Sequence, residues 1–109
     1  MSMHLNTPLL ESRPLGLATG QEIWLKMEAL QPCGSFKLRG VGLACEHHAR
    51  LGKRRFVSSS GGNAGIASAY AGRKLGLPVT VVVPETTTEP KMCRYLCSDE
   101  VSKNSPQQD

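Results

Sequence analysis

The chain has 109 residues, of which 39% are hydrophobic and 20% charged, an ordinary composition for one small soluble domain at the low end of length for a complete enzyme. The net charge is +4, but the one dense basic run, residues 53–55, is short and lacks interleaved aromatic side chains, so we expect no nucleic-acid partner. No apolar run approaches the length of a membrane span, and the N-terminus lacks the long apolar core of a signal peptide, so we expect a cytoplasmic protein without a membrane partner.

The N-terminal third has weak structural signals. Residues 1–20 are predicted as an irregular lead, extended near Pro8 and closed by a glycine-bracketed polar turn. Residues 23–27 alternate between apolar and other side chains and predict a short strand. A proline and a glycine in residues 31–34 then predict a turn.

From Ser35 the apolar spacing becomes helical. Ser35 is a plausible N-cap, and Gly52 stands where a helix would end. Val41, Ala44, Cys45 and His48 fall at positions i, i+3, i+4 and i+7, which predicts a helix, and we expect His47 and His48 on its exposed or flanking faces.

The next segments alternate between strand and helix patterns. Residues 55–58 predict a strand, residues 63–75 a helix with small residues that permit close packing on a sheet, and Gly76 its end. Residues 79–83 are almost all β-branched, as in a strand covered on both faces. The order strand, helix, strand, helix, strand predicts an α/β fold with a parallel sheet and right-handed crossovers.

The C-terminal part has no comparable pattern. Residues 86–96 are compatible with a helix, whereas residues 97–109 are polar and are predicted to be a tail without fixed structure. We therefore expect one folded region, residues 1–96, followed by that tail.

The four cysteines, at positions 33, 45, 93 and 97, form no C-x-x-C pair, and the last two have no histidine nearby. We expect reduced thiols and no metal site.

The first motif with chemical potential is Ser35-Phe36-Lys37, between a turn and a helix. A lysine amine can attack an aldehyde, and pyridoxal 5'-phosphate (PLP) is the common aldehyde cofactor. Phe36 is suited to cover one face of a flat ring. By itself the motif is better explained as an ordinary surface lysine, because short motifs recur by chance.

The second motif, residues 58–65, joins a strand to a helix through Gly61 and Gly62. Helix N-terminal amides lack intrahelical partners and carry partial positive charge, so this loop is suited to a carboxylate or phosphate. Ser60 adds a hydroxyl and Asn63 a side-chain amide. A simple capped turn is the alternative interpretation.

A dinucleotide-binding fragment is a further alternative. Gly62 and Gly65 fit the G-x-G-x-x-G fingerprint, and Glu85 stands about where a ribose-binding acid would be. Ser60 replaces the first glycine, however, and this interpretation leaves Lys37 without a role.

Together, residues 34–37 and 60–65 resemble the L-serine dehydratase/L-threonine deaminase family, PLP enzymes of fold type II, and the likeness extends from about Thr7 to Thr88. The resemblance implies the N-terminal part of a three-layer αβα, tryptophan synthase β-like fold. It also implies deamination of L-serine to pyruvate and ammonia, and of L-threonine to 2-oxobutanoate, with PLP as cofactor.

The resemblance assigns roles to individual residues. Lys37 matches the catalytic lysine that binds PLP, Phe36 the aromatic residue against the ring, and Asn63 the residue bonded to the ring oxygen. The loop that binds the substrate carboxylate is matched by Ser60, Gly62, Asn63 and Ala64.

The family pattern is lost after Thr88, where the loop for the PLP phosphate, the residue facing the ring nitrogen and the monovalent-cation residues are not found. We therefore expect a truncated chain that does not turn over serine. A non-catalytic form that binds a partner subunit or a small anion is the alternative, and a family-like homodimer is compatible with either.

Overall fold

A computed structural model of the chain describes residues 2–88 and 100–104. The helices are α1 (Arg13–Thr19), α2 (Lys37–Arg50) and α3 (Asn63–Leu75), with a 3-10 turn, η1 (Glu28–Leu30). The strands are β1 (Leu9–Glu11), β2 (Trp24–Lys26), β3 (Phe56–Ser58), β4 (Val79–Pro84) and β5 (Glu100–Asn104). None of the described helices is long and apolar enough to cross a membrane.

A parallel sheet of order β3-β4-β5 forms one layer of the fold. The unit β3–α3–β4 confirms the predicted α/β architecture, with Phe56 opposite Val79 across the first pair of strands. The β-branched run of β4 supplies the core, where Val79, Val81 and Val83 are at most 1% exposed and cluster with Ala69 of α3. β4 is thus the central strand of this sheet, and α3 covers one of its faces.

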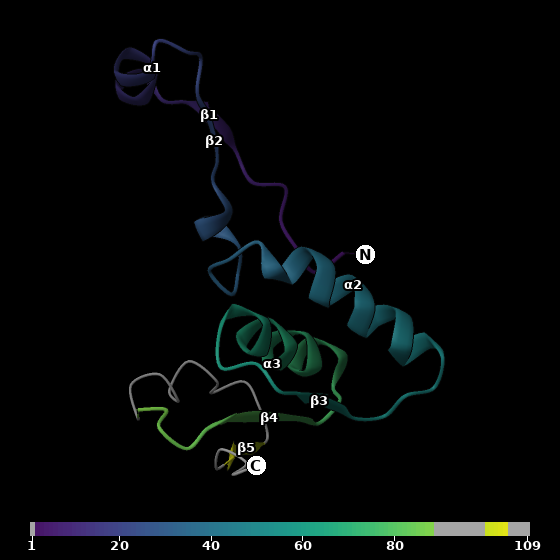
Figure 1. The fold of residues 1–109 in the computed structure, drawn as a ribbon. Coiled ribbons are helices and arrows are strands. Elements are labelled where there is room, and N and C mark those ends of the chain that lie inside the picture. Colours follow the sequence, from purple (N-terminus) through teal and green to yellow (C-terminus); the bar gives the residue numbers. More distant parts are fainter. Residues whose placement is uncertain (1, 89–99, 105–109) are drawn as a thin grey trace.

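Helix α3 lies between this sheet and α2, which forms the outer layer (Figure 1). Of the small residues predicted to permit close packing, Ala67, Ala69 and Ala71 are buried, as are Gly65 and Gly72, whereas Ala64 is half-buried. At Gly72 a β-carbon would stand only 1.9 Å from Cγ2 of Val79, so this position requires glycine for close approach to the sheet. α3 ends at Leu75, and Gly76 adopts the left-handed conformation expected of a helix end, with φ of 67°.

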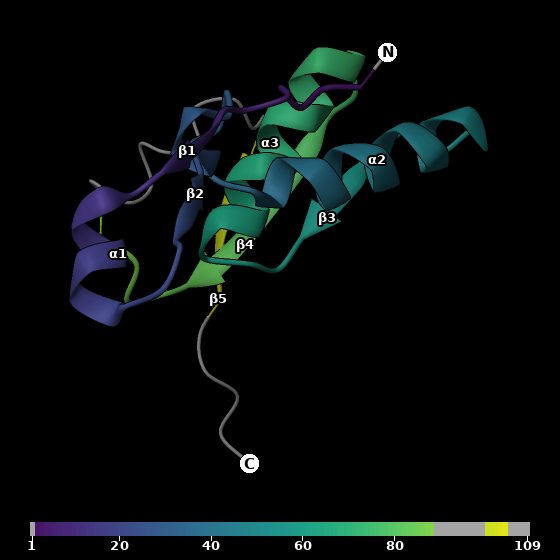
Figure 2. The ribbon, with the colours of Figure 1, turned by 90° about the horizontal axis from the view of Figure 1, so that it is seen from above.

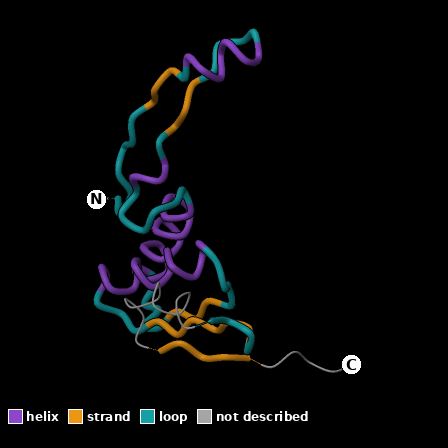
Figure 3. Tube along the Cα trace, turned by 90° about the vertical axis from the view of Figure 1, so that its left-hand side faces the viewer, coloured by secondary structure: helices purple, strands orange, loops and turns teal. Residues whose placement is uncertain are grey.

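The N-terminal region differs from the prediction of an irregular lead. Ser12 caps α1 by accepting a hydrogen bond from the Leu15 N–H at 3.4 Å, and Gly20 ends it with φ of 69°. β1 and β2 pair antiparallel on either side of α1 and project from the helices as an arm (Figures 1 and 3). The strand predicted at residues 23–27 therefore exists in shortened form, but it is not part of the parallel sheet.

The third strand of that sheet is β5, within the segment predicted to lack fixed structure. The prediction was wrong for residues 100–104, because pairing with β4 depends on main-chain groups that polar residues also carry. The rest of residues 97–109, and residues 89–96 of the suggested helix, lie outside the described residues.

The apolar spacing predicted helix α2 but only part of its buried face. Its buried residues are Leu38, Gly42 and Cys45, whereas Ala44 is exposed. His47 and His48 are exposed, as expected. Packing against α3, rather than apolar character alone, determines which side of this weakly amphipathic helix is covered. Gly52 follows the helix end as predicted, with φ of 90°.

Candidate functional site

Lys37 is the first residue of α2 and follows a tight turn. Gly34 has φ of 83°, and its N–H donates a hydrogen bond to the Gln31 carbonyl at 2.8 Å. The Lys37 side chain is exposed, and its Nζ lies 5.5 Å from the ring centroid of Phe36, which is itself 58% exposed. The amine and the aromatic face are therefore neighbours and both accessible to a ligand.

Ser35 is not the N-cap of α2. The N-cap residue is Phe36, which already has helical backbone angles and whose side chain makes no capping hydrogen bond. The Ser35 hydroxyl is instead buried, and Oγ has no hydrogen-bond partner in the described part of the chain. An unpaired buried hydroxyl beside an accessible lysine is a polar group that a neighbouring ligand could satisfy.

The second motif leads from β3 into α3 as predicted. Ser60 Oγ accepts a hydrogen bond from the Gly62 N–H at 3.2 Å, which shapes the loop. Gly62 is the N-cap residue of α3, so no side chain caps this helix. The N–H groups of residues 63–65 have no acceptor among the described residues. Asn63 is exposed at the start of the helix. The loop thus presents free amides, as an anion site does.

The two motifs lie at the same end of the helix pair. α2 and α3 pack against each other, and their N-terminal ends are on one side in Figures 1 and 2. Lys37 and Asn63 begin these two helices. Since both helix dipoles are positive at this end, the site favours an anionic ligand.

A network of polar side chains, which the sequence did not predict, underlies the Lys37 turn. Gln31 is 3% exposed, and its amide bonds both the N–H and the carbonyl of Leu5, at 2.8 and 2.9 Å. Glu28 accepts from Gln31 Nε2 at 2.7 Å and from Arg39 Nε at 2.7 Å. The hydrogen bond from Gln31, and secondarily Arg39, hold the pKa of Glu28 below its ordinary value despite partial desolvation.

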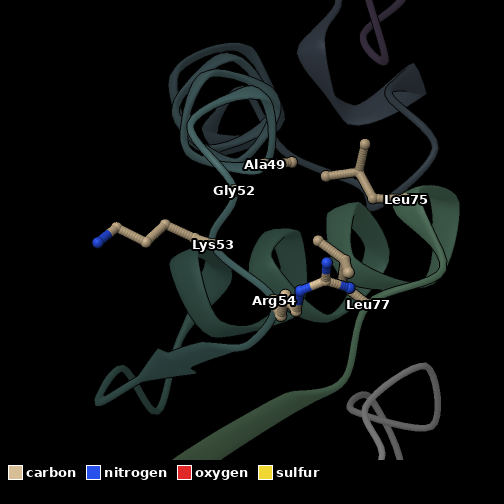
Figure 4. Close-up of a pocket in the computed structure, with 6 residues that line it drawn as sticks. All are labelled: Ala49, Gly52, Lys53, Arg54, Leu75 and Leu77. Atoms are coloured by element: carbon tan, nitrogen blue, oxygen red, sulfur yellow. The ribbon is translucent and has the colours of Figure 1, made fainter.

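A pocket at the opposite end of the helices is separate from this site. It lies beside the C-terminal ends of α2 and α3 (Figure 4) and is lined by Ala49, Gly52, Lys53, Arg54, Leu75 and Leu77. No sequence-predicted site residue lines it.

Metal-binding side chains do not cluster in the described residues, where no group of three or more His, Cys, Asp or Glu could hold an ion. Cys33 and Cys45 are free, and burial raises the pKa of the Cys45 thiol, so this thiol is poorly reactive. Cys93 and Cys97 lie outside the described residues.

Comparison with known proteins adds independent information. The family described as "Pyridoxal-phosphate dependent enzyme" matches residues 2–96. The chain is 56% identical over 85 residues to human serine dehydratase-like, covering 78% of this chain and 26% of that protein. It is 54% identical over 86 residues to mouse L-serine dehydratase/L-threonine deaminase, covering 79% and 26%. The chain thus spans about a quarter of the length of these relatives.

Solved structures share the fold. A serine racemase from Dictyostelium discoideum superposes with a TM-score of 0.83 at 31% identity, covering 94% of this chain and 34% of that one. A fungal L-serine ammonia-lyase from Rhizomucor miehei gives 0.79 at 30% identity, covering 100% and 35%. These likenesses confirm the predicted fold as the N-terminal portion of a fold type II PLP enzyme.

Proposed function

Because this chain belongs to the pyridoxal-phosphate dependent enzymes, we propose that it forms the lysine-bearing part of an L-serine/L-threonine ammonia-lyase site. Its curated relatives are named for serine dehydratase and threonine deaminase activity. The observation that carries the proposal is the shared position of two features: the exposed Lys37–Phe36 pair and the free amides at the start of α3 lie at one end of the helix pair.

The residues at this end fit part of a PLP site. Lys37 would bind the cofactor through Nζ, with Phe36 covering one face of the ring and the Asn63 side chain bonding the ring oxygen. When bound, PLP withdraws electrons from the α-carbon of an amino acid. Lys37 Nζ, once freed from the cofactor by the substrate amine, would take the α-proton. The β-hydroxyl would leave as water, and a water molecule would then release the amino group as ammonia, giving pyruvate from serine or 2-oxobutanoate from threonine.

The α3 loop would bind the substrate carboxylate. The helix amides and dipole attract an anion, and glycine at position 62 leaves the backbone open. The residues proposed for this role are Ser60, Gly62, Asn63 and Ala64. Ser60 presents its hydroxyl in a half-buried position beside the Gly62 amide.

We further propose that the 109 residues alone do not turn over serine. The groups that the resemblance assigns to the PLP phosphate and ring nitrogen have no counterpart in this sequence. A cofactor held by Lys37 without them would be poorly oriented, and misplacement of about 1 Å can cost roughly 100-fold in rate.

The test is pyruvate formation from L-serine with PLP. The purified chain should match a PLP-only blank, whereas a chimera in which residues 1–88 replace the matching part of human serine dehydratase-like should turn over. Lys37→Ala should abolish turnover in that chimera, and Lys53→Ala, at an exposed turn lysine, should not. Turnover by the Lys37→Ala chimera, or by the 109-residue chain above the blank, would contradict the proposal.

A non-catalytic, truncated subunit-interaction module is the second candidate, supported by the apolar surface of the arm. Large side chains on β1, α1 and β2 are exposed, including Leu17 at 77% and Trp24 at 49%. Sedimentation of the chain alone, and mixed with human serine dehydratase-like, tests for a homodimer and for a mixed complex. Sedimentation as a monomer in both experiments would contradict this candidate.

Two further proposals and one disfavoured alternative follow from the sequence. A cytoplasmic location can be checked by fractionation, and the absence of a nucleic-acid partner by a mobility-shift assay. The dinucleotide alternative is disfavoured by Ser60 in place of the first fingerprint glycine, and equilibrium dialysis with NAD tests it. Saturable NAD binding would revive it.

A further inference from the structure

We propose that Glu28, Gln31 and Arg39, together with the main chain of Leu5, form a brace that positions Lys37. This inference rests on the proposed function of Lys37 and extends it to residues that touch neither cofactor nor substrate. The three side chains are therefore positioning residues.

The first end of the Lys37 turn is fixed by Gln31. Its side chain is almost fully buried and makes three hydrogen bonds, of which two join it to Leu5, 26 residues away in the chain. The Gln31 carbonyl also accepts the Gly34 N–H that closes the turn. A buried amide satisfied from both sides holds the backbone more firmly than an exposed turn residue would.

The second end of the turn is fixed by Arg39, two residues after Lys37. Its Nε donates to Glu28 Oε1 at 2.7 Å, and its terminal NH2 group donates to the Leu5 carbonyl at 3.4 Å. Glu28 uses its other oxygen for Gln31. One carboxylate therefore ties together both ends of residues 31–39, and charge-assisted bonds of this length are the stronger kind.

The residues between these ends need such support. Lys37 and Phe36 are exposed, and the buried Ser35 hydroxyl makes no bond within the described chain. Among residues 35–39, Leu38 is the only buried apolar side chain, at 0% exposure. The direction of the Lys37 side chain thus depends on a backbone whose position is fixed by the hydrogen bonds of the brace.

The experiment uses the 109-residue chain and PLP as the probe. Glu28→Gln removes the charge and keeps the shape, and Arg39→Lys keeps the charge but loses the paired N–H groups. The matched control is Glu46→Gln, because Glu46 pairs with Arg50 on the same helix at 3.6 Å and takes no part in the brace. Borohydride trapping followed by peptide mass spectrometry gives the labelling rate at each lysine as a function of PLP concentration.

We expect both brace variants to lower the limiting labelling rate at Lys37 by roughly tenfold, since small misplacements of a reacting group cost large factors. Labelling at Lys53 should not change, and Glu46→Gln should behave as the unaltered chain. Amide hydrogen exchange should rise in residues 34–39 but not in α3, which separates positioning from a general loss of stability.

The outcomes distinguish the two proposals. Unchanged Lys37 labelling in both variants, or equal increases in exchange throughout the chain, would overturn the brace. Lys37 labelling no faster than Lys53 in the chimera would instead count against the proposed function. If Glu28→Gln lost the helical circular-dichroism signal and was therefore unfolded, the Lys37 labelling and hydrogen exchange of Arg39→Lys would test the brace by the same criteria.

Discussion

Replacing Gly72 with alanine should destabilise the protein, although alanine is the better helix former. Gly72 lies in α3 where the helix approaches the sheet, and an added β-carbon would stand 1.9 Å from Val79 Cγ2 and 3.0 Å from the Leu77 carbonyl oxygen. Val79 is 1% exposed and β-branched, so its side chain has little freedom to move away. The contact must therefore be relieved by separating α3 from β4.

The magnitude follows from two opposing effects. Alanine in place of glycine in a helix interior gains about 1 kcal/mol. Inserting a methyl group into a packed core costs about 1–3 kcal/mol, and a contact this short calls for the upper part of that range. We expect a net loss of about 2 kcal/mol, a large share of the ~5–15 kcal/mol that stabilises a typical domain.

Urea unfolding followed by circular dichroism measures this change from the midpoint and slope. Gly40→Ala is the matched control, because a β-carbon there would meet nothing within 4 Å, and it should stabilise α2 by up to about 1 kcal/mol. Combining Gly72→Ala with Val79→Ala should cost less than the sum of the single changes, since the second removes the clashing atom. Equal stabilisation by Gly72→Ala and Gly40→Ala would refute the packing of α3 on β4.

Three further predictions concern the site and its support. The pKa of Glu28 is lowered in the folded protein, so the stability that its hydrogen bonds contribute should be complete above the usual glutamate pKa near 4.5 and lost as pH falls through the lower pKa of the folded state. In urea unfolding measured at several pH values, Glu28→Gln should reduce this loss of stability at low pH, and an unchanged pH dependence would contradict the prediction. In the chimera, Asn63→Ala should reduce pyruvate formation at least roughly tenfold while changing stability by no more than about 0.5 kcal/mol, since Asn63 is exposed; near-normal turnover would leave the loop as a simple turn. The 109-residue chain should bind the apolar dye ANS through its exposed arm, where Leu17→Glu should weaken the signal, and an identical signal from that variant would place the dye elsewhere.

The parts of the fold that the sequence predicted well are those where local and tertiary preferences agree. The helix at 63–75 was predicted with its observed bounds, because its glycine end signal and its small residues satisfy both the helix and the close packing on the sheet. β4 was predicted for the same reason, since its β-branched run suits both the strand and a position covered by neighbours.

The parts that were missed depend on contacts distant in the chain. α1 has only seven residues and contains a glycine, so no periodic pattern could reveal it, although Ser12 and Gly20 are recognisable as caps in retrospect. β5 is polar and is defined by pairing with β4. The bonds between Gln31 and Leu5 span 26 residues, and a lone glutamine in a turn gives no signal of such a partner.

The candidate site divides in the same way. The sequence predicted roles for the lysine and the glycine loop because each combines a residue type with a characteristic turn, and the structure places the two N-terminal helix ends on one side. The predicted cap at Ser35 was wrong because Phe36 adopts helical angles, and the serine hydroxyl is buried without a hydrogen-bond partner in the described residues.

The attachment of PLP to Lys37 is the central claim, and trapping in the chimera tests it most directly. Borohydride reduction with PLP, followed by peptide mapping, should place the label on the peptide that carries Lys37, and Lys37→Ala should remove it while Lys53→Ala leaves it intact. Undiminished labelling of the Lys37→Ala chimera would contradict the claim.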